Sequence, residues 1–246
     1  MKELLQENRP LIVASLSGRE RLSDASRRAT NLGADLIEVR IDSLKPKERA
    51  NIKNILSAVK ENTSCPIIAT VRSSAEQGPN KEVFPIAEPE RKNLIEEAMS
   101  LADWVDLELE GGETTLAAIR LARKLKKKVI LSYHDFKGIP SQEKVKKLAS
   151  DFVQRQGNVL KIVGMASSAA DVVRLLEMCR DLPQFKRSFI AMGDIGRLSR
   201  VGGFLFGSCL TYGYMNKPTA PGQVSVTELV ELCRLFYPSS RSATKK

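Results

Sequence analysis

The chain has 246 residues, of which 42% are hydrophobic and 28% charged, and its formal net charge is +10. This composition is typical of a globular protein with a sizeable core, and the positive charge is compatible with several classes of anionic partner. A nucleic-acid surface would interleave basic and aromatic residues, but only 5% of the residues are aromatic and no such pattern occurs. No apolar run is long enough to span a membrane. We therefore expect neither a nucleic-acid nor a membrane partner.

The N-terminus and the cysteines bear on the cellular compartment. The first ten residues lack the apolar core of a signal peptide. The four cysteines, Cys65, Cys179, Cys209 and Cys233, are far apart and form no C-x-x-C pair. Because His134 is the single histidine, a structural zinc site is not expected. These features predict a cytoplasmic protein with reduced thiols and no metal.

Short apolar runs alternate with longer amphipathic stretches along the chain. The expected strands are Leu11–Leu16, Leu36–Ile41, Pro66–Val71, Trp104–Leu109, Lys128–Tyr133, Val159–Val163, Ser188–Met192 and, less clearly marked, Phe206–Thr211. The clearest expected helices are Arg19–Asn31, Ala87–Ala102, Glu113–Lys126, Gln142–Gln154, Ser167–Cys179 and Val226–Phe236. Strands rich in Val, Ile and Leu that are separated by helices indicate parallel βαβ units.

Eight such repeats predict an α/β protein with a single (β/α)₈ TIM barrel over residues 1–246. An open doubly wound sheet is the alternative. That fold has a glycine-rich turn after its first strand, whereas the turn here reads Ser15-Leu-Ser-Gly-Arg19. No linker divides the chain, and residues 1–9 and 239–246 are expected to be flexible ends.

Charged residues gather where the expected strands end, which is where such barrels carry their active sites. Glu38, Arg40 and Asp42 alternate with apolar residues and are expected on one face of the second strand. Asp106, Glu108 and Glu110 repeat this pattern on the fourth. Any one of these charges could be paired in a polar layer of the barrel, but the set as a whole favours a binding site.

Lys161 lies in the apolar run Asn158–Gly164, and His134 ends the preceding strand at a comparable height. A lysine on a strand is usually one whose ammonium reaches water, but apolar neighbours on both sides imply burial here. Burial favours the neutral amine, which is a nucleophile toward carbonyl carbons. A histidine titrates near neutral pH and can move protons. Together the two residues indicate imine chemistry with acid–base help.

The ordered motifs resemble those of the type I 3-dehydroquinate dehydratases, which form an imine with their substrate. The matching motifs, which cover nearly the whole chain, are Glu38-x-Arg40-x-Asp42, Thr70-Val-Arg72-Ser, Ser132-Tyr-His134-Asp-Phe136, Lys161 in its strand, Met192-Gly, Ser199-Arg200, Phe206-Gly-Ser208 and Ala220-Pro-Gly-Gln223. The resemblance implies dehydration of 3-dehydroquinate to 3-dehydroshikimate in the shikimate pathway, which leads to the aromatic amino acids.

The resemblance also implies catalytic roles. Lys161 would form the Schiff base, His134 would act as general base and acid, and Glu76 would orient His134. The implied substrate-binding residues are Ser15, Glu38, Arg40, Arg72, Arg200, Thr219 and Gln223. Among these, Arg200 would grip the substrate carboxylate, and Thr219 and Gln223 would belong to a loop that closes over the ligand.

Two positions depart from the family pattern: Thr219 stands where serine is common, and Lys137-Gly-Ile-Pro140 lacks a threonine before proline. Neither departure removes an implied role. No organic cofactor is expected, because the lysine imine would serve as the electron sink. No dinucleotide fingerprint suggests a fused dehydrogenase. The family is often dimeric, so a homodimer is the implied assembly.

Two other functions remain open from the residues alone. A class I aldolase on the same barrel would share the imine lysine, and Gly202-Gly203 or Gly207-Ser208 could be offered as its phosphate site. A barrel that binds an anionic polymer or a protein would suit the net charge, but it would not explain the charged strand ends.

Overall fold

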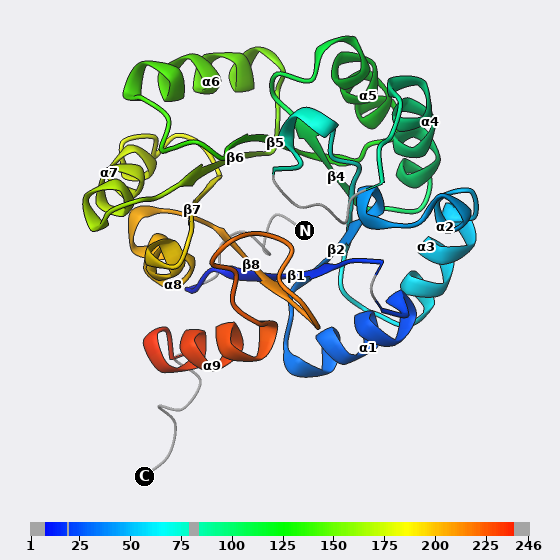
Figure 1. Cartoon of the computed structure of the whole chain (residues 1–246), viewed down its shortest axis with the longest axis horizontal. Coiled ribbons are helices and arrows are strands. Elements are labelled where there is room, and N and C mark those ends of the chain that lie inside the picture. Colours follow the sequence, from blue (N-terminus) through cyan, green and yellow to red (C-terminus); the bar gives the residue numbers. More distant parts are fainter. Residues whose placement is uncertain (1–7, 19, 79–83, 239–246) are drawn as a thin grey trace.

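The computed structural model describes residues 8–18, 20–78 and 84–238, and its strands and helices alternate around a central barrel (Figure 1). The strands are β1 (Leu11–Leu16), β2 (Leu36–Arg40), β3 (Ile67–Thr70), β4 (Trp104–Glu108), β5 (Lys128–Asp135), β6 (Val159–Met165), β7 (Arg187–Met192) and β8 (Leu210–Tyr214). The α-helices are α1 (Leu22–Leu32), α2 (Pro46–Arg49), α3 (Ile52–Glu61), α4 (Glu88–Met99), α5 (Gly112–Lys124), α6 (Gln142–Gln154), α7 (Ala169–Arg180), α8 (Ser199–Gly202) and α9 (Val226–Phe236). Short 3₁₀ helices are η2 (Ile41–Ser43), η3 (Ser74–Glu76), η4 (Ile195–Leu198) and η5 (Gly203–Phe206).

The eight strands form one parallel sheet in the order β7-β6-β5-β4-β3-β2-β1-β8. The two outer strands of this order meet and close the barrel. The backbone N–H of Cys209 donates to the carbonyl of Arg187 over 2.7 Å, and the Ser188 hydroxyl donates to the carbonyl of Leu210 over 2.8 Å. The predicted (β/α)₈ barrel is therefore confirmed, and the open doubly wound sheet is excluded.

The barrel interior changes from apolar to polar along the strands. Alternate residues of a strand face the same side. Six interior positions in the amino-terminal half are apolar: Val13, Leu36, Ile68, Trp104, Ile130 and Val159. The residues two positions later on the same strands are all polar: Ser15, Glu38, Thr70, Asp106, Ser132 and Lys161. The larger apolar core lies outside the barrel, between strands and helices.

Serine caps mark the starts of three helices that the sequence predicts closely. Ser141 caps α6, while Ser168 with Asp171 and Ser225 with Glu228 form capping boxes at α7 and α9. In each case the serine hydroxyl accepts a backbone N–H that has no partner inside the helix. The bounds of α6 and α9 are those predicted, and α7 begins two residues later than predicted.

Other boundaries differ from the prediction. The expected eighth strand, Phe206–Thr211, is wrong, because Phe206 ends η5 and Gly207 turns the chain with a φ of +97°. The strand begins instead at Leu210. Strand β5 continues to Asp135 and β6 to Met165, two residues beyond the predicted ends of both. The helix expected from residue 19 begins at Leu22, and residue 19 itself lies outside the described residues, as do 1–7 and 239–246 of the predicted flexible ends.

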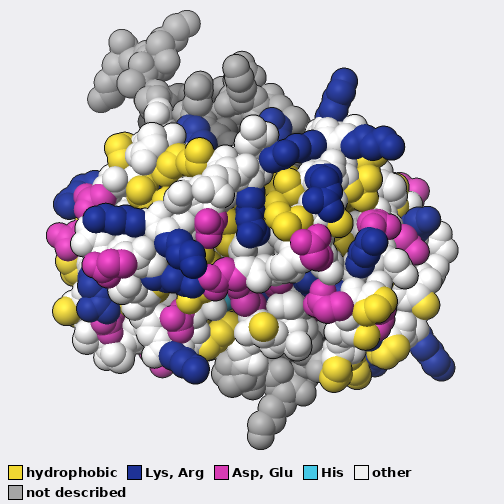
Figure 2. Space-filling model, turned by 90° about the horizontal axis from the view of Figure 1, so that it is seen from above, with side chains coloured by type: hydrophobic (Ala, Val, Ile, Leu, Met, Phe, Trp, Pro, Cys, Tyr) yellow, Lys and Arg dark blue, Asp and Glu magenta, His cyan; other side chains and the backbone are white. Residues whose placement is uncertain are grey.

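The surface carries no concentrated basic face in the view of Figure 2, where Lys and Arg side chains are interspersed with Asp and Glu. None of the helices in the described ranges is long and apolar enough to cross a membrane. The four cysteines are all described and are free thiols, with Cys179 and Cys233 buried.

Candidate active site

A cavity lies at the carboxyl ends of the strands and contains about 570 Å³ of empty space, part of it open to solvent. All ten residues that the sequence singles out line it: Ser15, Glu38, Arg40, Arg72, Glu76, His134, Lys161, Arg200, Thr219 and Gln223. Residues that sequence reasoning missed also line it, among them Gln77, Phe136 and Tyr212. The barrel therefore gathers side chains that are up to 208 positions apart in the chain, from Ser15 to Gln223.

Lys161 is buried within β6, with 5% of its surface exposed. Its ammonium donates a hydrogen bond of 2.9 Å to Asp106 Oδ2 on β4 and lies 4.0 Å from the centre of the Tyr212 ring on β8. The sequence correctly predicts this burial. Reasoning from burial alone omits Asp106, however, whose carboxylate forms an ion pair with this lysine.

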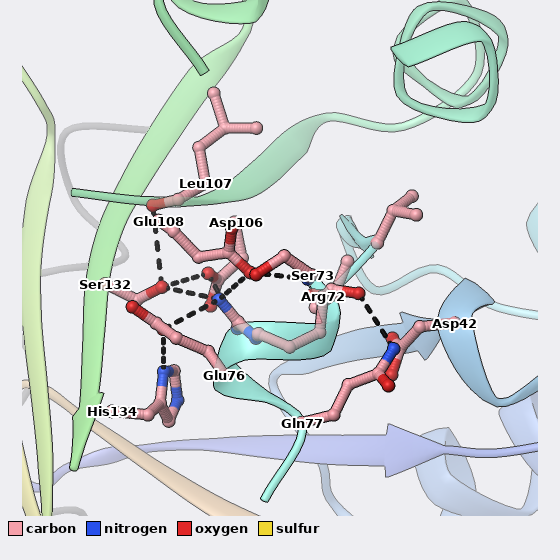
Figure 3. A network of polar contacts seen from close by, with 12 residues as sticks. Asp42, Arg72, Ser73, Glu76, Gln77, Asp106, Leu107, Glu108, Ser132 and His134 are labelled. Atoms are coloured by element: carbon pink, nitrogen blue, oxygen red, sulfur yellow. Dashed lines mark hydrogen bonds and ion pairs between the residues drawn. The ribbon is translucent and has the colours of Figure 1, made fainter. Parts of the chain in front are cut away.

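Asp106 is the centre of a buried network (Figure 3). Its Oδ1 accepts hydrogen bonds from Arg72 Nη2 over 2.9 Å and from the Ser132 hydroxyl over 2.6 Å. Arg72 Nη1 in turn donates to Ser132 Oγ over 2.8 Å. Burial by itself would raise the pKa of Asp106, but Arg72 and Lys161 hold it well below its usual range. The aspartate is therefore an anion throughout the physiological pH range.

His134 and Glu76 form a second, partly buried pair, in which His134 Nδ1 lies 2.8 Å from Glu76 Oε2 (Figure 3). Burial lowers the pKa of His134 well below its ordinary value, and the positive charges of Arg72 and Lys161 lower it further. Burial also raises the pKa of Glu76 to about 8, against the opposing effect of Arg72. The pair therefore binds its shared proton more readily at Glu76 than as a histidine cation.

Strand register explains how His134 comes close to Lys161. In the β5–β6 ladder, Ser132 pairs with Lys161 and His134 with Val163. His134 therefore faces the cavity one layer nearer to the mouth of the barrel than the lysine. The 3₁₀ helix η3 brings Glu76 to the imidazole, and Gly78 follows it with a φ of +69° against the ring of Phe136, where a Cβ atom would collide.

Glu108 and Arg91 support the segment that carries Arg72 and Glu76, and sequence reasoning assigned neither a role. Glu108 accepts hydrogen bonds from Arg91 over 2.7 Å and from the backbone N–H of Ser73 over 2.6 Å. Arg91 also donates to the carbonyl of Val71 over 2.9 Å. Arg91 is 1% exposed although it lies in the first turn of α4. A buried arginine is not recognisable from the helix pattern, because its partner is on a strand.

On β2, Glu38 and Arg40 face the cavity, but both have partners. The Glu38 carboxylate accepts hydrogen bonds from Ser15 Oγ over 2.6 Å and from Thr70 Oγ1 over 2.9 Å. Arg40 forms two hydrogen bonds to Asp42, of 3.0 and 2.7 Å. The prediction that Asp42 continues the strand is wrong, since η2 begins at Ile41; Asp42 is fully buried and fixes the Arg40 guanidinium.

Arg200 in α8 lies on the other side of the cavity and is 3% exposed. Its guanidinium donates only to backbone carbonyls, those of Gly222, Tyr212 and Pro221, at 3.0 to 3.4 Å. Within the described ranges it forms no ion pair with a carboxylate. Burial and the nearby charge of Arg197 lower the pKa of Arg200 to about 10, and it is still a cation at neutral pH. Its positive charge is therefore available to an anionic ligand.

The segment after β8 closes this side of the cavity. Gln223 Oε1 accepts hydrogen bonds from Thr219 N over 2.7 Å and from Thr219 Oγ1 over 3.0 Å. Gly222 has a φ of +68°, and a Cβ atom there would collide with the carbonyl of Gly193. The loop is thus folded on itself and packed against the end of β7. Among the described residues, no group of three or more His, Cys, Asp or Glu side chains is arranged to hold a metal.

Known proteins share both the sequence and the fold. The family model of the type I 3-dehydroquinases matches residues 12–240. The 3-dehydroquinate dehydratase of Hydrogenobaculum sp. is 35% identical over 204 residues, which are 83% of this chain and 89% of the relative. That of Methanocaldococcus jannaschii is 38% identical over 206 residues, 82% of this chain and 88% of the relative. The crystal structure of the enzyme from Geobacillus kaustophilus superposes with a TM-score of 0.84 and 26% identity, covering 94% of this chain and 93% of that one.

Proposed function

This chain belongs to the type I 3-dehydroquinase family, whose members are hydro-lyases, and from that premise we propose that it dehydrates 3-dehydroquinate through a Schiff base on Lys161. The observation that carries the proposal is the position of Lys161, buried between Asp106 and the Tyr212 ring in the cavity that His134 also lines. A solved relative, the type I enzyme of Clostridium difficile with covalently modified comenic acid, has a TM-score of 0.83 with this chain.

Lys161 is the proposed nucleophile. After transfer of one proton, its amine adds to the C3 ketone of the substrate. The ketone oxygen then leaves as water, and the lysine nitrogen becomes a positively charged iminium. The Asp106 carboxylate, 2.9 Å from Nζ, stabilises positive charge on this nitrogen both before and after the reaction. The iminium withdraws electrons from the neighbouring carbon and makes the C2 proton acidic.

His134 is the proposed general base and acid. It removes the C2 proton and then protonates the C1 hydroxyl, which leaves as water and completes the elimination. Glu76, 2.8 Å from Nδ1, fixes the ring orientation, so that Nε2 is the nitrogen available to the substrate. Hydrolysis of the product imine returns Lys161 to its initial state.

Arg200 is the proposed partner of the substrate carboxylate. The cavity holds other arginines, but Arg40 and Arg72 each have an aspartate partner within 3 Å. Arg200 has none among the described residues, and a guanidinium can grip two carboxylate oxygens at once. The anionic end of the substrate is therefore expected next to α8, opposite the carboxylates of β2 and β4, which would repel it.

The remaining cavity residues are proposed to bind the neutral part of the substrate. Glu38, Arg40 and Arg72 carry hydrogen-bonding groups that could hold the ring hydroxyls, and Ser15 fixes Glu38. Thr219 and Gln223 close the loop over the ligand, which keeps water away from the imine. We propose that the enzyme needs no metal or organic cofactor, and that it works in the cytoplasm as a homodimer.

The test is borohydride reduction in the presence of 3-dehydroquinate, followed by intact-protein mass spectrometry and peptide mapping. We expect a ligand-sized adduct on the peptide that contains Lys161. Lys161→Ala should give no adduct, whereas Lys144→Ala, which changes a half-buried lysine on α6 outside the cavity, should be modified like the wild type. Folded wild-type protein without an adduct, or an adduct on another lysine, would contradict the proposed mechanism.

A further inference from the structure

Tyr212 contacts two of the cations that line the cavity, and the proposed mechanism gives it no task. The residue is 4% exposed and lines the cavity from β8. Its ring contacts the Lys161 ammonium, 4.0 Å from the ring centre, and its backbone carbonyl accepts a hydrogen bond of 3.3 Å from Arg200. Tyr212 therefore contacts the proposed nucleophile through its side chain and the proposed anion-binding residue through its main chain.

The hydroxyl of Tyr212 is buried without a hydrogen-bond partner, and within the described cavity wall it is the one buried side-chain polar atom in this situation. A buried hydroxyl without a hydrogen-bond partner destabilises the protein, whereas a phenylalanine ring at this position would not. The charged groups that act on this hydroxyl are Asp106, Glu38 and Arg72. Burial, together with the two carboxylates, raises the pKa of Tyr212 well above 10, so that the hydroxyl keeps its proton and remains a donor.

Imine formation changes the number of donors around Asp106. In the unliganded protein its carboxylate accepts hydrogen bonds from Arg72, Ser132 and Lys161. When the ammonium becomes an iminium, two of its three N–H hydrogens leave with the ketone oxygen as water. The remaining N–H is confined to the plane of the new C=N bond. Oδ2 of Asp106 then has at most this one N–H from the lysine nitrogen, and a carboxylate oxygen can accept a second donor beside it.

We propose that Tyr212 is a positioning residue for Lys161: its ring holds the ammonium beside Asp106, and its hydroxyl donates to the Asp106 carboxylate once the lysine nitrogen has entered the imine. The inference rests on the proposed Schiff-base function and extends it. The added donor keeps Asp106 oriented, and it stabilises the imine relative to the free enzyme. The hydroxyl is thus unpartnered in one state of the reaction and bonded in the other.

Tyr212→Phe tests this inference, because it removes the hydroxyl and keeps the ring against Lys161. We expect kcat to fall about tenfold, KM to stay within about twofold and less enzyme to be trapped by borohydride at saturating 3-dehydroquinate. The Tm should be unchanged or higher, since an unpartnered hydroxyl is removed. Tyr133→Phe is the matched control: Tyr133 lies on β5 with its ring against Lys144, outside the cavity, and its loss of a hydroxyl should leave kcat and the trapped fraction unchanged.

Two outcomes would overturn the inference. One is a Tyr212→Phe enzyme with wild-type kcat and a wild-type trapped fraction. The other is a loss of activity that disappears when the maximal rate is divided by the concentration of folded protein. Borohydride trapping of the wild-type protein distinguishes failure of this inference from failure of the proposed function. An adduct on wild-type Lys161 with an unchanged Tyr212→Phe variant removes only the role of the hydroxyl, whereas a wild type without an adduct removes both.

Discussion

The two sides of the cavity differ in the partners that they give to a buried arginine. On the side of β2 to β5, Arg72 is 3% exposed and makes hydrogen bonds to Asp106 and Ser132. On the side of α8 and β8, Arg200 is equally buried and makes hydrogen bonds only to carbonyls of the main chain. The first guanidinium is neutralised by the protein, whereas the second keeps a net charge for a ligand. The same residue type is thus part of the scaffold on one side and, in the proposed function, a binding group on the other.

The difference also separates two tasks of the proposed reaction. Proton transfer needs groups in fixed orientations, and the paired side supplies these through Asp106, Glu76 and Glu108. Anion recognition needs a charge that is desolvated before the ligand arrives, and Arg200 meets this requirement. Substitutions on the two sides should therefore have different signatures: changes in kcat and in stability on the paired side, and changes in KM on the other.

The largest effect is expected from Lys161→Ala, on the paired side. Removal of the amine abolishes the imine, and kcat should fall by more than about 10³-fold. The Asp106 carboxylate keeps Arg72 and Ser132 as donors, so the barrel should still fold. Steady-state assays with 3-dehydroquinate, with circular dichroism as the folding control, measure both quantities. Activity within tenfold of the wild type would show that the paired side is structural only.

His134→Ala should lower kcat by about 10²- to 10⁴-fold, the usual contribution of a general acid–base group. In contrast to the lysine variant, it should still form the imine, because Lys161 and Asp106 are untouched. Borohydride trapping distinguishes the two variants: a reduced adduct is expected with His134→Ala and not with Lys161→Ala. Absence of the adduct from a folded His134→Ala protein would assign the histidine to imine formation rather than to elimination.

Arg200→Ala tests the difference between the two sides of the cavity most directly. Truncating one partner of a buried charge pair weakens binding by about 2–5 kcal/mol, so KM should rise by roughly 30-fold or more. Because no carboxylate in the described structure depends on Arg200, the Tm should change little. Arg72→Ala should raise KM less than Arg200→Ala does but lower the free energy of unfolding by about 3–5 kcal/mol, since it leaves Asp106 short of a cation.

Arg197→Ala is the control for this experiment, as Arg197 is exposed and pairs with Asp194 at the surface. Its KM and Tm should remain close to those of the wild type. Equal effects of Arg200→Ala and Arg72→Ala on KM and on unfolding would show that the two sides of the cavity do not differ as proposed.

The smallest effect is a pH dependence of kcat/KM. The pKa of Glu76 is raised to about 8, so below this pH the carboxyl is protonated and donates to His134 Nδ1, which leaves the hydrogen of the neutral ring on Nε2. Above it, the carboxylate accepts Nδ1–H and Nε2 is free to act as a base. kcat/KM should therefore rise with pH, by up to about tenfold per unit, and level off above about pH 8. Glu76→Gln should flatten this rise, and an unchanged profile would contradict the assignment.

The residues that were recognised from the sequence carry a local signal, whereas the roles that were missed depend on contacts between distant strands. Lys161 and His134 are recognisable because a polar residue interrupts an apolar strand pattern, which is a local signal. Asp106 was seen as one of an alternating set, but its partnership with Lys161 depends on β4 and β6 lying on either side of β5, with both side chains in the same layer of the barrel interior. Tyr212 was missed entirely, because an aromatic residue in a strand looks like any other core residue until its hydroxyl is found without a partner.

The fold was predictable from the regular repeat of strand and helix, but the last strand was not. Phe206, Gly207 and Ser208 look like the start of an apolar run, yet the first two form the end of η5 and a left-handed turn. The position of such a turn is decided by packing: Gly207 lies against the Arg187 side chain, where a Cβ atom would collide. Sequence patterns report local preferences and cannot include this tertiary contact.

The closure of the barrel between β7 and β8 has a consequence for its internal motions. Seven pairs of neighbouring strands share continuous ladders, whereas this junction is an isolated bridge from Arg187 to Ser208. In hydrogen exchange, amides along this seam should lose protection earlier than those of β4 to β6, since fewer bonds must open together. The seam runs beside the segment that carries Arg200, so the side proposed to bind the anion is also the side where we expect the barrel to open most readily.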